Sequence, residues 1–391
     1  MPVGPPDESL ADMLADLEEL VLCESYSADH EAVASSARVV AAQGRRVLQA
    51  EPETAVIGGV THLRWSFGTP KVLLLGHHDT VWPIGSLRDH PWSVVDGVAR
   101  GPGVFDMKAG LVQLFHAVAS LPSPDGITVL VVGDEELGSP TSRPLIESIA
   151  SECGAAFVLE ASADGGALKV ARKGVSRYEL VVYGKAAHAG LEPELGINAG
   201  VELAHQILAV NDIARQVESS SQAGVVSVTP TLMSAGTSTN TVPAVGRVAI
   251  DVRVPDVAAQ ERVDELMRGL TPRTPGTRLE LRGGPNRPPL EASASAALFE
   301  VATRIAGGLG IGPLRGVSVG GGSDGNFTAG VGCPTLDGLG AVGGGAHAAE
   351  EHVVVAEMPV RARLVAALAA EVLSSGPGGG PGSVLNGEPA R

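Results

Sequence analysis

The sequence predicts an α/β protein with a mostly parallel sheet in its main domain and an α+β domain of ferredoxin-like order inserted into it. Three observations support this fold class. Short apolar strands alternate with helices in residues 1–173, which is typical of a parallel sheet covered by helices. From residue 174 the order becomes β-α-β-β-α-β, the ferredoxin-like order. After residue 286 the first pattern returns, and 391 residues exceed what one core usually organises.

The elements of the first part follow from apolar spacing. Apolar residues from Leu10 to Val21 repeat at helical spacing, with Asp7 and Ser9 as candidate N-caps. The strands are expected at 72–75, 128–132 and 156–159, and the helices between them at 108–121 and 144–151.

The inserted domain is expected at 174–285. Its predicted strands are 177–183, 225–229, 247–254 and 278–282, and its predicted helices are 198–213 and 257–270. Within 247–254 valine and isoleucine alternate with polar residues, which indicates a strand with one buried face. Residues 286–289 resemble a linker, and the main domain then resumes over 286–373 with helices at 293–309 and 355–373. The tail, 374–391, is rich in glycine and proline and is expected to be disordered.

Charge and hydropathy disfavour several classes of partner. A formal net charge of −16 disfavours nucleic acid and anionic membranes, because both attract basic surfaces. There is no apolar run of membrane-spanning length and no signal-like segment near the start, so we expect a cytoplasmic protein. The three cysteines are far apart and are expected to be reduced thiols.

Chemically active side chains follow each apolar strand of the first part. His77 and Asp79 follow the first, Glu135 and Glu136 the second, and Glu160 the third. Since the carboxyl ends of parallel strands meet at one edge of a sheet, these side chains should converge.

Two further residues lie in glycine-rich loops. Asp106 belongs to GPGVFDMK at 101–108, and His347 to GGGAH at 343–347. Two histidines and several carboxylates, without a cysteine cluster, suit zinc or a similar divalent ion. A pair of ions is expected if one carboxylate is shared.

Four motifs resemble one family. They are GHHDTV at 76–81, GPGVFDMK at 101–108, DEELGS at 134–139 and KAAHAG at 185–190. They are similar to motifs of the dizinc peptidases that include glutamate carboxypeptidase, succinyl-diaminopimelate desuccinylase, acetylornithine deacetylase and aminoacylase. The resemblance extends from about residue 10 to 373 and implies a dizinc exopeptidase domain with an inserted lid and dimerisation domain.

The resemblance implies a role for each residue of the predicted site. One Zn²⁺ would be held by His77, Asp106 and Glu160, and the other by Asp106, Glu136 and His347; Co²⁺ or Mn²⁺ remain alternatives. Asp79 would orient the His77 ring, and Glu135 would be the general base. Met107 departs from several relatives, which have a second acid there.

In the lid, the resemblance assigns His188 to the developing oxyanion, and Asn240 and Arg253 to a substrate carboxylate. The loop GGGSDG at 320–325 is similar to a glycine-rich substrate loop of the family. The family also implies a homodimer through the lid, in which His188 completes the partner's site; delivery of His188 within one chain by lid closure is the alternative.

The run from His188 to Ala199 is most similar to the glutamate carboxypeptidase branch. The sequence therefore predicts a carboxypeptidase acting on a small substrate with a free carboxylate, either a peptide or an N-acyl amino acid. The alternative within the family is an N-acyl-amino-acid deacylase. A third hypothesis, a metal-bearing binding protein without catalysis, is disfavoured because Glu135 and all five ligand positions are present.

Overall fold

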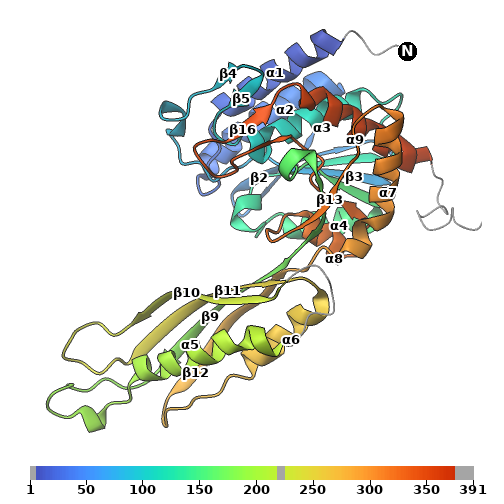
Figure 1. Cartoon of the computed structure of the whole chain (residues 1–391). Coiled ribbons are helices and arrows are strands. Elements are labelled where there is room, and N and C mark those ends of the chain that lie inside the picture. Colours follow the sequence, from blue (N-terminus) through green and yellow to red (C-terminus); the bar gives the residue numbers. More distant parts are fainter. Residues whose placement is uncertain (1–5, 218–224, 375–391) are drawn as a thin grey trace, which may run out of the picture. The chain divides into compact units, whose positions relative to one another are not determined.

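The computed structural model describes residues 6–217 and 225–374, which form two compact units (Figure 1). The second unit comprises the described residues of Arg172–Glu291 together with Val319–Gly322, and the first unit comprises the rest. Of the tail expected to be disordered, Ser374 ends a helix and residues 375–391 lie outside the described residues. No helix among the described residues is long and apolar enough to cross a membrane.

A mostly parallel sheet organises the first unit, as predicted. Its strand order is β1-β2-β6-β3-β7-β14, with the bounds β1 Glu53–Ile57, β2 Val60–Ser66, β3 Val72–His77, β6 Ile127–Val132, β7 Ala155–Val158 and β14 Thr335–Leu336. β3 pairs in parallel with both β6 and β7, and β7 with β14. The antiparallel hairpin β1–β2 at the edge was not predicted; its turn residues Gly58 and Gly59 have φ of 59° and 89°, which glycine adopts without steric cost.

Helices cover both faces of this sheet. Their bounds are α1 Pro6–Leu22, α2 His30–Leu48, α3 Ala109–Ala119, α4 Arg143–Glu152, α7 Ala292–Gly308, α8 Gly325–Gly330 and α9 Glu357–Ser374. Alternate residues of β3 point to opposite faces. Val72 and Leu74 join the core cluster with α1, α2, α3, α7 and α9, whereas Leu73 and Leu75 join the cluster with α4 and α8. α1 begins at Pro6, before both candidate cap residues, Asp7 and Ser9.

A small sheet beside the main one has the order β15-β16-β5-β4. Its strands are β4 Ser93–Val95, β5 Val98–Arg100, β15 Gly343–Gly344 and β16 His352–Val354. β15 and β16 form a hairpin, and β16 pairs with β5 so that His352 lies opposite Arg100. The hairpin loop, 345–351, is thereby held against the chain that follows β5. A separate pair of strands, β8 Leu168–Arg172 and β13 Gly316–Val319, completes the strands of this region.

The second unit has the predicted ferredoxin-like order. Its elements are β9 Gly174–Tyr183, α5 Ala199–Gln216, β10 Ser227–Ala235, β11 Val245–Val254, α6 Val257–Arg268 and β12 Arg278–Arg287. The sheet order is β10-β11-β9-β12, with antiparallel neighbours throughout. Val248, Ile250, Val252 and Val254 are buried, as their alternation predicted.

The unit, Arg172–Glu291 with Val319–Gly322, is longer than the expected 174–285. β12 continues to Arg287, so the first half of the segment expected to be a linker, 286–289, lies in a strand. Its two ends also pair with each other: Arg172 and Leu290 exchange backbone hydrogen bonds of 2.9 and 3.0 Å.

Candidate metal centre and active site

The strand ends of the first unit position the predicted residues. His77 is the last residue of β3, and Glu160 follows β7 by two residues. Glu135 and Glu136 lie in the short 3₁₀ turn η3 (Glu135–Leu137) after β6. Because β3 is hydrogen-bonded to β6 on one side and β7 on the other, these ends open at one edge of the sheet. Asp106, in the irregular turn η2 (Val104–Lys108), and His347, in the β15–β16 loop, reach the same place.

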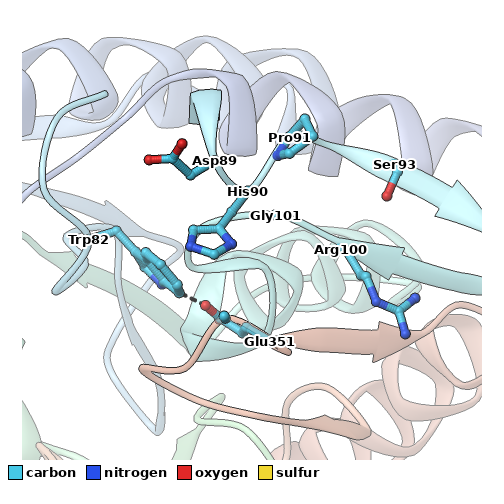
Figure 2. Close-up of a pocket in the computed structure, with 9 residues that line it drawn as sticks. Trp82, Asp89, His90, Pro91, Ser93, Arg100, Gly101 and Glu351 are labelled. Atoms are coloured by element: carbon cyan, nitrogen blue, oxygen red, sulfur yellow. Dashed lines mark hydrogen bonds between the residues drawn. The ribbon is translucent and has the colours of Figure 1, made fainter. Parts of the chain in front are cut away.

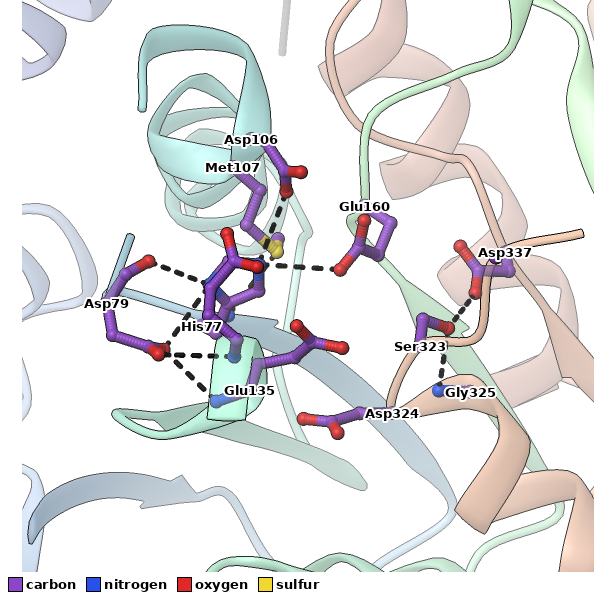
Figure 3. Close-up of polar contacts among 12 residues, drawn as sticks. His77, Asp79, Asp106, Met107, Glu135, Glu160, Ser323, Asp324, Gly325 and Asp337 are labelled. Carbon is purple, nitrogen blue, oxygen red and sulfur yellow. Dashed lines mark hydrogen bonds and ion pairs between the residues drawn. The ribbon is translucent and has the colours of Figure 1, made fainter. Parts of the chain in front are cut away.

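Asp106 lies between the two histidines and presents a different oxygen to each (Figure 3 shows the His77 side). Its Oδ1 is 3.4 Å from His77 Nε2, and its Oδ2 is 3.2 Å from His347 Nε2. Glu160 Oε1 is 3.4 Å from His77 Nε2, and Glu136 Oε1 is 3.3 Å from His347 Nε2. Two imidazole-carboxylate groups therefore share one carboxylate.

These residues fit a divalent cation. His77 Nε2 and Glu136 Oε1 are buried, yet neither makes a hydrogen bond of normal geometry with any described residue. Buried polar atoms rarely lack a partner, and such an atom calls for an ion or water. A mixed imidazole and carboxylate donor set is the type that zinc and related ions bind.

Asp79 fixes both His77 and the turn after β6. The His77 Nδ1 lies 3.0 Å from the Asp79 backbone carbonyl and 3.4 Å from its carboxylate Oδ1. Since a carbonyl can only accept, Nδ1 carries a proton, and Nε2 lies on the side of the acids, where it can bind a cation once its own proton is displaced. The Asp79 carboxylate also accepts the backbone N–H groups of Glu135 and Glu136, each at 3.2 Å. The expected orienting role thus involves the Asp79 carbonyl as well as its carboxylate.

Without a cation the site binds protons instead. Contacts with Asp106 and Glu136 raise the pKa of His347 to about 10. Burial raises the pKa of Glu136 to about 8. Burial lowers the pKa of His77, but its contacts with Asp106, Asp79 and Glu160 outweigh burial and leave the pKa well above its ordinary value. A cation must therefore displace protons when it binds here.

Glu135 lies beside this constellation and is 9% exposed. One of its carboxylate oxygens, one of Glu160 and a His77 ring nitrogen all lie within 4.8 Å of one another. By distance Glu135 is close enough to ligate a metal or to exchange protons with a water in the site. The ligand sets predicted from sequence supply three residues to each ion without it, which leaves an open position of the kind that catalytic metals keep.

Close packing holds Glu160 in place. A Cβ on Gly110 of α3 would lie 2.1 Å from the Leu159 carbonyl oxygen. On Gly340 it would lie 2.1 Å from the same atom and 2.8 Å from the Glu160 carbonyl oxygen. Only glycine permits this approach at either position, so the backbone that carries Glu160 is held from two sides.

Residues next to the predicted ligands have packing roles. His78 is buried, and its Nε2 lies 3.1 Å from the Thr61 carbonyl, in agreement with its expected packing role. Met107, the departure from several relatives, is buried, and its sulfur accepts the His77 backbone N–H at 3.3 Å.

The predicted lid residues lie in the second unit. His188 and Asn240 are exposed on adjoining segments, where Ala189 N donates to the Asn240 carbonyl at 2.9 Å. Arg253, on β11, is partly buried, and its Nε and Nη2 donate to the two Asp251 carboxylate oxygens at 2.8 and 3.0 Å. The structure thus brings His188 near Asn240, and it shows Arg253 paired with an acid that sequence reasoning did not consider.

Sequence reasoning missed buried acids that support the site. Asp324 accepts a hydrogen bond from Ser139 Oγ. Ser323 Oγ donates to Asp337 at 2.5 Å (Figure 3). These contacts anchor the second half of the 320–325 loop. Glu351 is 2% exposed and contacts the loop of Asp106. The available signal was its position, four residues after His347 and directly before an apolar strand.

Comparisons with known proteins agree with this geometry. A profile of Peptidase family M20/M25/M40 matches residues 73–371. Carboxypeptidase G2 of Pseudomonas sp. (strain RS-16) is 29% identical over 375 residues, covering 91% of this chain and 88% of that protein. Succinyl-diaminopimelate desuccinylase of Caulobacter vibrioides is 27% identical over 202 residues, covering 47% of this chain and 50% of that one.

A solved structure shares the fold. An M20 family metallo-carboxypeptidase from Sulfolobus solfataricus superposes with a TM-score of 0.69 at 16% identity, covering 93% of this chain and 98% of that one. The profile match spans most of the chain, including the strands and loops that carry the histidines and carboxylates described above. The resemblance inferred from the motifs is therefore confirmed: the chain belongs to Peptidase family M20/M25/M40, whose members hydrolyse amide C–N bonds.

Proposed function

We propose that the protein is a two-metal carboxypeptidase that releases a C-terminal amino acid, with glutamate as the first candidate. The observation that carries this proposal is the sharing of Asp106 between two histidine-carboxylate groups, with Glu135 beside them. The likeness to carboxypeptidase G2 over 91% of the chain supports the choice of reaction. Zinc is the first candidate metal, and Co²⁺ or Mn²⁺ suit the same donors.

Two divalent ions in this donor set would polarise the scissile carbonyl and make water acidic enough to be deprotonated near neutral pH. Glu135 accepts that proton and delivers it to the departing amine, which is the work of a single general acid-base group. Asp79 holds both the His77 ring and the Glu135 backbone, so the ligand and the base keep a fixed spacing. No nucleophilic side chain is required.

The lid residues suit the binding of substrate oxygens. His188 Nδ1 accepts the N–H groups of Gly190 and Leu191, each at 3.1 Å. A neutral imidazole with Nδ1 as the acceptor carries its proton on Nε2, so the exposed edge of His188 is a donor suited to a developing oxyanion. Asp251 binds one side of the Arg253 guanidinium, which leaves the Nη1 side to receive a substrate carboxylate, with Asn240 as a further contact.

An N-acyl-amino-acid deacylase is the second candidate, because the desuccinylase of Caulobacter vibrioides resembles part of the chain and the same site would act on either bond. We would load the purified protein with zinc and measure amino acid release from dipeptides with varied C-terminal residues and from N-acetylated amino acids. Peptide cleavage supports the carboxypeptidase, whereas cleavage of the N-acyl amino acids alone supports the deacylase. Absence of both activities in metal-loaded protein would contradict the proposal.

We also propose a homodimer formed through the second unit, in which His188 serves the partner's site. Mixing inactive His188→Ala and Glu135→Ala proteins should then restore activity, because one mixed site retains both its own Glu135 and the partner's His188. If subunit exchange is verified and no activity returns, His188 acts within its own chain or outside the reaction.

A further inference from the structure

The carboxylate of Glu351 connects the loops that carry the proposed metal ligands. It is 2% exposed. Its Oε1 accepts the backbone N–H groups of Phe105 and Asp106 at 2.9 and 3.0 Å. Its Oε2 accepts the Gly103 N–H at 3.0 Å. The same oxygen accepts the Trp82 indole N–H at 2.6 Å (Figure 2). Both oxygens are therefore occupied by N–H donors.

These partners belong to different parts of the site. The backbone donors lie in the turn that contains Asp106, the shared carboxylate. Trp82 follows Asp79 by three residues, and Glu351 itself follows His347 by four. The pairing of β16 with β5 brings Glu351 to the Asp106 turn. His352 lies opposite Arg100, so Glu351, the residue before His352, reaches the turn that begins at Gly101.

We propose that Glu351 is a positioning residue that holds the Asp106 turn and the His347 loop in the arrangement that binds two ions. This inference rests on the proposed function, since it concerns the same metal site. Glu351 would act through the backbone of Asp106 and not as a ligand. Outer partners of this kind typically change metal affinity or activity by roughly 10- to 100-fold when they are replaced.

One substitution, Glu351→Gln, separates the hydrogen-bonding role of Glu351 from its role in filling space. All four hydrogen-bond partners of Glu351 described above are N–H donors, so the site requires an acceptor at both oxygens. Glu351→Gln keeps the size and shape of the side chain but places an NH₂ group against N–H donors, so one half of the contacts is lost. A residue that only filled space would tolerate this change.

Glu24 offers a matched control. Its carboxylate accepts backbone N–H groups of Gly85 and Leu87 at 2.8 to 3.1 Å, and so orders a neighbouring loop that carries none of the proposed ligands. Glu24→Gln makes the same chemical change in the same unit. It should loosen residues 85–87 and leave the metal site as it is.

The test is a Co²⁺ titration of metal-free full-length protein, followed by the visible absorption spectrum, with hydrogen exchange of the backbone amides as a second readout. Glu351→Gln should weaken Co²⁺ binding about 10- to 100-fold, change the spectrum and speed exchange at 103–106 in the metal-free state. Glu24→Gln should bind Co²⁺ like the unmodified protein. Trp82→Phe, which removes only the indole contact, should shift affinity in the same direction by a smaller factor.

Each outcome decides between the proposals. Unchanged Co²⁺ affinity and spectrum in both Glu351→Gln and Trp82→Phe would overturn the role of Glu351 while leaving the metal site intact. Equal weakening by Glu24→Gln would also overturn it, because loop packing in general would then be responsible. Failure of the unmodified protein to bind Co²⁺ would instead contradict the proposed function itself. If Glu351→Gln does not fold, the Trp82→Phe titration alone decides.

Discussion

Replacement of Glu135 by glutamine separates proton transfer from metal binding. The substituted side chain keeps its length, and the backbone N–H that Glu135 donates to Asp79 at 3.2 Å is unaffected, so the turn after β6 should keep its shape. What is lost is the proton acceptor. A positioned acid-base group contributes roughly 10²- to 10⁴-fold in rate, which corresponds to about 3 to 5 kcal/mol of transition-state stabilisation.

The assay is kcat and KM for the best substrate of the screen, together with elemental analysis of the purified protein. Glu135→Gln should lower kcat by roughly two to four orders of magnitude, change KM little and retain both metal ions. Glu136→Gln is the contrast, because it removes a proposed ligand and should lose one ion. A Glu135→Gln protein that keeps its rate, or that loses metal like Glu136→Gln, would refute the assignment of Glu135 as the base.

Three further outcomes are expected. Asp106→Ala should lose both ions, whereas Glu160→Ala should weaken mainly one, as elemental analysis would show; two full equivalents in Asp106→Ala would contradict the shared ligand. Metal affinity should rise with pH between about 6 and 8, by about tenfold per unit for each proton displaced. The reason is that the raised pKa of His347, about 10, keeps this side chain protonated in the metal-free protein. Calorimetry in buffers of different ionisation enthalpy should detect proton release on metal binding, and the absence of proton release would contradict this reasoning. Glu202→Ala should destabilise the second unit by about 2 to 4 kcal/mol, because the buried Glu202 carboxylate accepts the backbone N–H groups of Arg273 and Thr274. Unchanged hydrogen-exchange protection of the second unit would contradict this prediction.

Elements with strong local periodicity could be predicted from the sequence. β3, β6 and β7 are largely apolar runs that lead to His77, Asp134 and Glu160, and their parallel arrangement brings the side chains at their ends together as expected. The hairpin β1–β2 was missed because its strand β1 is largely exposed and lacks an apolar alternation.

The supporting contacts could not be predicted, because they depend on distances between segments that the sequence does not specify. Glu351 forms its hydrogen bonds across 245 to 269 residues of chain, and its place directly before β16 does not reveal which segments it contacts. Asp251 lies two residues from Arg253 on the same strand, yet only the side-chain geometry reveals that the two charges are paired.

The reciprocal pairing of Arg172 with Leu290 determines how the inserted segment could be removed or exchanged. The inserted segment departs and returns at this isolated bridge, so a short turn joining these two residues would close the gap that its removal leaves. Apart from Val319–Gly322, the unit is one continuous stretch of chain. The inserted segment can therefore be removed or exchanged at one pair of residues, and the sequence that carries His77, Glu136 and Glu160 lies outside it.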